Sequence, residues 1–159
     1  MAMSPAVRIY QDNLDAVSKA LMDGDLQEVM KFIAIPNMMS TRDTELVMSS
    51  PEELDMVMQD FRAQLLARGV TSYRRICLEA DFVTGRDDMI AGHHRTETRS
   101  DTGVAVEPYL NHIVLMRIDG RWMGIWLQAI MDNTELQILS PDIAAAQAEA
   151  RRMLNTLRR

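Results

Sequence analysis

The stretch VEPYLNHIVLMRIDGRWMGIWLQAIM, residues 106–131, decides the fold of this chain. Its side chains alternate in character on both sides of Asp119 and Gly120, a dipeptide favoured in two-residue hairpin loops. Two more alternating runs precede it, over residues 72–83 and 88–99, and short turn sequences separate them. The four runs predict an antiparallel meander of strands at 72–83, 88–99, 106–118 and 121–131.

Helical patterns lie on both sides of the meander. A first helix is expected over about residues 5–22, and a second should end near Ile35 because Pro36 disfavours helical geometry in the residue before it. The serine and glutamate of a capping box predict a third helix over 51–68, and an alanine-rich fourth helix is expected from Pro141. The stretch between the second and third helices is expected to be loop with short strands.

Composition bounds the class of protein. The chain has 159 residues, a formal net charge of -6 and a pI near 5.0, so long-range repulsion disfavours nucleic acids and anionic membranes as partners. The single cysteine, Cys77, allows no internal disulfide, and no apolar run approaches the roughly 20 residues of a membrane span. We therefore expect a cytoplasmic protein with one α+β domain over residues 1–135, followed by a linker and an amphipathic helix over 136–159.

Hairpin pairing predicts which side chains share a face of the sheet. If Ile118 opposes Arg121, one nearly apolar face is formed, and it is expected to cover the helices. That inner face contains Leu110, His112, Val114, Met116, Ile118, Met123, Ile125, Leu127, Ala129 and Met131. The outer face then contains Tyr109, Asn111, Ile113, Leu115, Arg117, Trp122, Gly124, Trp126, Gln128 and Ile130.

The inner face is predicted to carry one polar cluster. Pairing around the preceding turn favours His93 as an inward neighbour of His112, although the length of the next turn leaves open whether His93 or His94 faces inward. A small, largely apolar ligand is expected there, bound by His93, His112, Arg95, Arg74, Met116, Met123 and Leu127. His112, with His93, is the candidate for acid-base catalysis, and the alternative is an ordinary core histidine.

Other chemistry has less support in the sequence. Two histidines leave a zinc site without its third protein ligand, so no metal is expected, and no cofactor motif is present. Cys77 is predicted on the outer face with Glu79 and Asp81, where nearby carboxylates would raise the pKa of its thiol. We therefore expect a structural role for this cysteine.

The order of elements resembles that of a known superfamily. Three helices, the second opened by Gly24-Asp25-Leu26, and a long meander ending in Asp119-Gly120-Arg121-Trp122 are similar to the nuclear transport factor 2-like superfamily. The similarity covers about residues 5–132. It implies a cone-like, curved antiparallel sheet packed on the N-terminal helices with a cavity between them, and the C-terminal helix is an addition.

The resemblance also implies frequent dimerisation through the outer surface of the sheet. This fits an outward Trp122 and Trp126, and the expected homodimer interface contains these two residues with Tyr109 and Gln128.

Members of the superfamily include ketosteroid isomerase, scytalone dehydratase and polyketide cyclases. The catalytic groups of the isomerase correspond approximately to Val17, Thr41 and Val114 here, and none of these does that proton-transfer chemistry. Fold alone therefore leaves three hypotheses. They are small-molecule binding in the cavity, a cofactor-independent lyase or isomerase that uses the inward histidines, and a noncatalytic assembly module.

Overall fold

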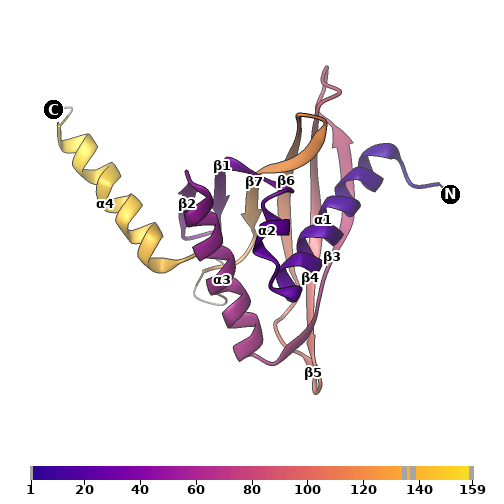
Figure 1. The fold of residues 1–159 in the computed structure, drawn as a ribbon, viewed down its shortest axis with the longest axis horizontal. Coiled ribbons are helices and arrows are strands. Elements are labelled where there is room, and N and C mark those ends of the chain that lie inside the picture. The colour runs from indigo at the N-terminus through magenta and orange to yellow at the C-terminus, as the bar shows by residue number, and fades with distance from the viewer. Residues whose placement is uncertain (1, 134–135, 137–138, 158–159) are drawn as a thin grey trace.

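Helices cover one side of a single curved sheet in the computed structural model, which describes residues 2–133, 136 and 139–157 (Figure 1). The helices are α1 (Pro5–Asp23), α2 (Leu26–Val29), α3 (Pro51–Ala67) and α4 (Pro141–Leu157). The strands are β1 (Ile33–Ser40), β2 (Glu45–Met48), β3 (Val70–Phe82), β4 (Met89–Ser100), β5 (Gly103–Val104), β6 (Tyr109–Ile118) and β7 (Arg121–Ala129). The expected domain boundary at residue 135 lies outside the described residues.

Local capping chemistry sets the ends of the long helices. The Ser4 hydroxyl accepts a hydrogen bond from the Val7 amide at 3.2 Å, and the Ser50 hydroxyl accepts from the Glu53 amide at the same distance. Gly24 ends α1 in the left-handed region, with φ of 74°, and donates back to carbonyls of the last turn. These contacts confirm the predicted starts of the first and third helices and the predicted end of the first.

The predicted end of the second helix is wrong. α2 stops at Val29, and the chain enters β1 at Ile33 instead of remaining helical to Ile35. β1 runs parallel to β7 and antiparallel to β2, so it covers an edge of the meander whose backbone groups would otherwise lack partners. The Asn37 amide group donates to the Gly124 carbonyl at 2.7 Å and ties the two strands together.

The sheet contains the predicted meander and extends it. Its strand order is β2-β1-β7-β6-β4-β3, in which the last four strands pair antiparallel as expected, and β5 pairs with the end of β4. The Asp119-Gly120 hairpin opposes Ile118 to Arg121, as predicted. The sheet is nevertheless mixed, because β1 and β7 are parallel.

The predicted assignment of inner and outer faces is wrong for β6. Its buried residues are Tyr109, Asn111, Ile113 and Leu115, whereas His112 is exposed. Two bulges produce the error, because Leu78 in β3 and Ile125 in β7 have no paired residue and each shifts the alternation of its strand by one position. The bulge in β7 divides the predicted inner set, so that Met123 pairs with Met116 on the outer side while Leu127, Ala129 and Met131 lie on the core side.

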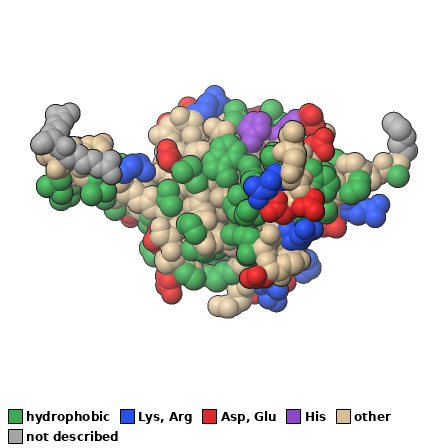
Figure 2. Space-filling view, turned by 90° about the horizontal axis from the view of Figure 1, so that it is seen from above, with side chains coloured by type: hydrophobic (Ala, Val, Ile, Leu, Met, Phe, Trp, Pro, Cys, Tyr) green, Lys and Arg blue, Asp and Glu red, His purple; other side chains and the backbone are tan. Residues whose placement is uncertain are grey.

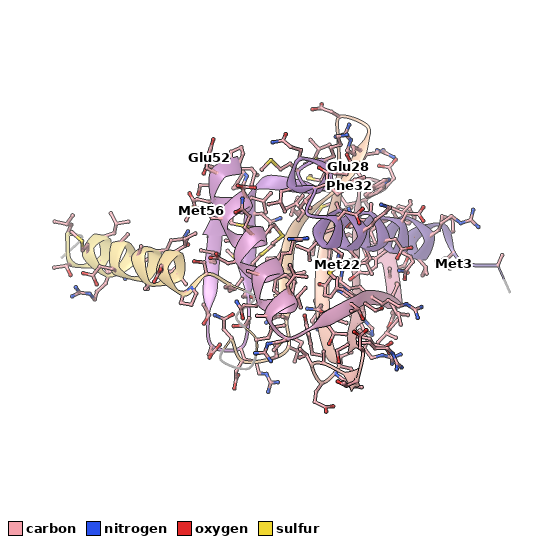
Figure 3. The ribbon with its side chains drawn as sticks, turned by 60° about the horizontal axis from the view of Figure 1, so that its bottom comes forward. Met3, Met22, Glu28, Phe32, Glu52 and Met56 are labelled. Carbon is pink, nitrogen blue, oxygen red and sulfur yellow. The ribbon has the colours of Figure 1, made fainter. Side chains whose placement is uncertain are left out.

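The core consists of two clusters under the sheet. The larger joins α1 and α3 to β1, β2 and the segment that contains Leu136 and Leu139, and the smaller joins the first half of α1 to β3, β4 and β6. α4 projects from this body (Figures 1 and 3), held at its base by two hydrogen bonds between the Gln147 side chain and the Val47 backbone. Met56, labelled on α3 in Figure 3, lines the groove at that base. No helix among the described residues is long and apolar enough to cross a membrane.

Candidate functional site

A cavity of about 60 Å³ lies between the helices and the inner face of the sheet. Residues from α1, α3, β1, β3, β4, β6 and β7 line it. Its apolar lining consists of Val17, Leu21, Ile33, Met39, Met58, Phe61, Ile113 and Leu127, with Gly124 and Trp126. Its polar lining consists of Asn13, Asn37, Tyr73, Arg75, His94, Tyr109 and Asn111. The described lining residues include no aspartate or glutamate.

His94 is the buried histidine of the cavity. The β3–β4 and β4–β6 pairings put it opposite Cys77 and Asn111, and its exposed fraction is 0%. Its Nδ1 atom lies 2.7 Å from the hydroxyl of Tyr10, which reaches it from α1. Its Nε2 atom is buried and has no hydrogen-bond partner among the described residues. One ring nitrogen is therefore committed to the fold, and the other is buried without a partner in a residue that lines the cavity.

Gly92 makes the contact between Tyr10 and His94 sterically possible. It lies two residues before His94 on the same face of β4, and a Cβ atom there would meet Tyr10 Cε2 at 2.7 Å and the Glu79 carbonyl oxygen at 2.6 Å. The Tyr10 ring therefore lies directly against the strand backbone. From this position its hydroxyl reaches His94.

Burial keeps both partners of this hydrogen bond neutral. Burial, and then the nearby positive charge of Arg75, lower the pKa of His94 from 6.5 to about 2. Burial raises the pKa of Tyr10 above its ordinary value. A neutral phenol has one proton to donate, so we assign the Tyr10 O–H as donor to Nδ1. The ring proton of His94 is then on Nε2, which makes the unpartnered atom a hydrogen-bond donor.

Arg75 is a buried cation beside His94. Its exposed fraction is 8%, and because it pairs with Thr96 it is a diagonal neighbour of His94 on the inner face. Its Nε atom donates to the Ser18 hydroxyl at 2.8 Å, and a terminal nitrogen donates to the Leu14 carbonyl at 3.1 Å. The Tyr73 ring lies 5.7 Å from the guanidinium carbon. All of these partners are uncharged.

The predicted inward position of His93 and His112 is wrong. The two histidines oppose each other on β4 and β6, with ring centroids 5.9 Å apart, and line a shallow groove on the outer face with Glu79 and Asp81. Figure 2 shows histidine atoms at the molecular surface beside acidic side chains. The open choice between His93 and His94 is thus resolved in favour of His94, because the bulge at Leu78 changes the pairing. A role for His93 and His112 in ligand binding or catalysis stays a prediction, but the buried cavity does not contain them.

The other predicted ligand residues are also separated. Leu127 lines the cavity as expected. Arg95 pairs with Glu97 at 2.8 Å and Arg74 is exposed, because both lie on the outer face opposite Arg75 and His94. Met116 and Met123 oppose each other on the outer side, where the bulge in β7 puts them.

The expected dimer surface is divided between the two faces. Trp126 and Gln128 line the outer groove as predicted. Tyr109 is 8% exposed and faces the core, and Trp122 packs against the smaller cluster with its ring centroid 6.2 Å from that of Phe82. Dimerisation stays a prediction, and Tyr109 and Trp122 are not on the surface that was expected to mediate it.

Cys77 is on the inner side of β3 and not with Glu79 and Asp81 on the outer face, because the bulge at Leu78 separates them. Burial raises the pKa of its thiol, which is the expected direction from a different cause. Within the described part of the chain, no group of three or more His, Cys, Asp or Glu side chains is arranged to hold a metal ion.

Replacement of Tyr10 by phenylalanine should test the buried hydrogen bond. The ring and its packing on Gly92 would remain, but Nδ1 of His94 would lose its donor in a site that excludes water. We expect the free energy of unfolding to fall by about 1.5 kcal/mol in urea denaturation. Tyr73→Phe removes a buried hydroxyl that bonds to Tyr109 and not to His94, so it measures the loss of a buried phenol bond elsewhere in the core. Equal stability of Tyr10→Phe and the unmodified protein would refute the hydrogen bond.

Known proteins resemble this chain in fold but not in sequence. No protein-family model matches the sequence, and no curated protein matches it. A domain of unknown function with a cystatin-like fold from Nostoc punctiforme superposes with a TM-score of 0.63 at 11% identity, over 99% of both chains. An NTF-2 like protein of unknown function from Shewanella oneidensis gives 0.60 at 12% identity, over 77% of this chain and 97% of that one. A protein of unknown function from Mycobacterium tuberculosis gives 0.60 at 14% identity, over 92% and 89%.

The identities are too low to transfer a function, but the superpositions agree with the helices and curved sheet described above. The chain has the nuclear transport factor 2-like fold.

Proposed function

We propose that the protein binds a small molecule in the central cavity and that His94 Nε2–H is its hydrogen-bond donor. One observation carries this proposal: His94 is a lining residue of the cavity, and its Nε2 atom is fully buried and has no partner among the described residues. A buried donor left unpaired costs about 1–3 kcal/mol, so a fold that retains one needs an occupant that accepts the bond.

The cavity limits the size and character of the ligand. Its volume of about 60 Å³ is well below the roughly 300–1,000 Å³ typical of sites for drug-sized molecules. The occupant is therefore small. The aliphatic, thioether and aromatic walls suit an apolar body, and the side that contains His94 suits a polar end.

Binding is favoured over acid-base catalysis by the protonation state of the same residue. A general base works best when its pKa lies near the working pH, and a His94 with a pKa of about 2 accepts protons poorly. Tyr10, with its raised pKa, is an equally poor acid. The lyase or isomerase hypothesis therefore has no suitable proton carrier in the described lining of the cavity.

The histidine substitutions test the proposal directly. Native mass spectrometry of the protein purified under mild conditions should show a copurified small molecule. Its retention should be lost in His94→Phe, which removes the donor and keeps a planar ring. Retention should persist in His94→Gln, whose terminal amide occupies nearly the position of Nε2–H. His112→Phe, on the outer face, is the matched control and should retain the ligand.

A second measurement detects the site without a copurified molecule. The Nε2 resonance of His94 should shift in ¹⁵N NMR when small fragments such as propionamide or propionate are added. A protein that purifies without a ligand and whose Nε2 resonance moves with neither fragment would refute the proposal. That outcome would mean a cavity occupied by water alone and would favour the assembly hypothesis.

A further inference from the structure

We infer that the ligand is a short carboxylic acid, bound as its anion between Arg75 and His94. This inference rests on the proposed function and adds the chemical class of the ligand. It arises from a charge imbalance, because a buried guanidinium and a neutral imidazole lie on adjacent strands in a cavity without acidic lining residues.

The charge of Arg75 has no counter-ion in the described structure. No carboxylate of a described residue lies within 4.0 Å of it, whereas Arg42, Arg86, Arg95 and Arg152 each form an ion pair. Asp15 and Arg75 both line a surface groove beside α1, but they form no ion pair, and Asp15 accepts a hydrogen bond from Gln11 instead. Burial of an unpaired ion costs several kcal/mol of desolvation free energy. An anion from outside the chain would offset this cost, and it is the partner that the described residues do not supply.

The neutral groups of the cavity do not supply that charge. Burial raises the pKa of both Tyr73 and Tyr109, so neither phenol becomes an anion near neutral pH. Asn111 is uncharged, and its carbonyl oxygen already accepts a hydrogen bond from the Thr96 hydroxyl at 2.6 Å. Arg75 therefore remains the one charged side chain in the described lining of the cavity.

A carboxylate fits the two donors. It is planar and has two acceptor oxygens, which suits one bond from the guanidinium and one from the Nε2–H of a diagonal neighbour. A cavity of about 60 Å³ leaves room for a short apolar chain behind the carboxylate, against Ile113 and Leu127. Larger anions such as nucleotides exceed this volume.

Paired probes of equal size separate charge from shape. Propionate and propionamide have the same number of non-hydrogen atoms, so calorimetric titration of each into the unmodified protein at pH 7 and constant ionic strength compares them directly. We expect at least tenfold tighter binding of propionate. Arg75→Gln should remove this preference, and Arg95→Gln, which alters an outer-face arginine of β4, should leave it unchanged.

The results with the two probes show whether the carboxylate assignment fails alone or together with the proposed function. Equal or tighter binding of propionamide would overturn the carboxylate assignment and leave small-molecule binding intact. Failure of both probes to bind or to shift the Nε2 resonance of His94 would overturn both. If Arg75→Gln does not fold, NMR titration of the unmodified protein decides. Bound propionate should raise the pKa of His94 by at least one unit, and an unchanged pKa would refute contact with the anion.

Discussion

Gly92→Ala is expected to lower the free energy of unfolding by about 3 kcal/mol, a large fraction of the stability of a domain of this size. The added Cβ would lie 2.6 Å from the Glu79 carbonyl oxygen and 2.7 Å from the Tyr10 ring. Neither neighbour yields easily, because the first is backbone of the paired strand and the second is a fully buried ring. The strand or the helix that carries Tyr10 must move, which also weakens the bond to His94.

The matched control is Gly124→Ala on β7. Gly124 is also buried in the sheet, but a Cβ there would meet its nearest neighbours at 3.7 Å and 4.0 Å, which are ordinary contact distances. Its stability in urea denaturation should stay within about 1 kcal/mol of that of the unmodified protein. Equal losses in the two variants would show that both reflect a general cost of alanine in the strands and not the close approach of Tyr10.

The arrangement of elements was predictable because it depends on local signals. The serine caps at residues 4 and 50, the glycine at 24 and the hairpin at 119–120 act over a few residues, and the structure contains each of them. The first half of β1 was assigned to the second helix, because its apolar residues follow a short helix without a break and Pro36 reads as a helix terminator. The short strands expected between the second and third helices are present as the rest of β1 and as β2. The parallel pairing of β1 with β7 joins segments about ninety residues apart, which no local pattern reports.

The alternation of side chains could not predict the site, because one unpaired residue in a strand moves all following side chains to the opposite face of the sheet. Uninterrupted pairing from Ile76 and Arg95 would oppose Leu78 to His93, but Leu78 is unpaired in the bulge and Glu79 opposes His93 instead. His94 consequently points inward. A signal was nevertheless present, since a glycine within an alternating strand often marks a close backbone approach, and Gly92 directly precedes the two histidines.

Arg75 and Tyr10 show a second limit of sequence reasoning. Tyr10 is fully buried with the apolar residues of α1, but its hydroxyl gives it a polar partner 84 residues away. Arg75 lies between exposed and half-buried neighbours in a strand with several charges, and its burial depends on the position of α1. The polar groups of the cavity are therefore products of tertiary packing.

Acidification from pH 7 to pH 5 should destabilise the protein by about 2 kcal/mol through His94 alone. In the unfolded chain this histidine takes up a proton near its ordinary pKa of 6.5, whereas in the folded protein it stays neutral to about pH 2. Between those values the unfolded state binds more protons, so stability is full above pH 6.5 and falls as the pH decreases. The slope approaches about 1.4 kcal/mol per pH unit.

Denaturation of refolded, ligand-free protein at a series of pH values measures this loss, and His94→Gln isolates its source. The variant keeps His93, His112 and every carboxylate, so the difference between the two stability curves reports His94 alone. The curves should separate progressively below pH 6.5, with the variant less sensitive to acid. Added propionate should bring the curve of the unmodified protein closer to that of the variant, because an anion at Nε2 favours the protonated ring in the folded state. Parallel curves without propionate would show that His94 is not held neutral by burial, and the binding model built on its Nε2–H would then lose its electrostatic basis.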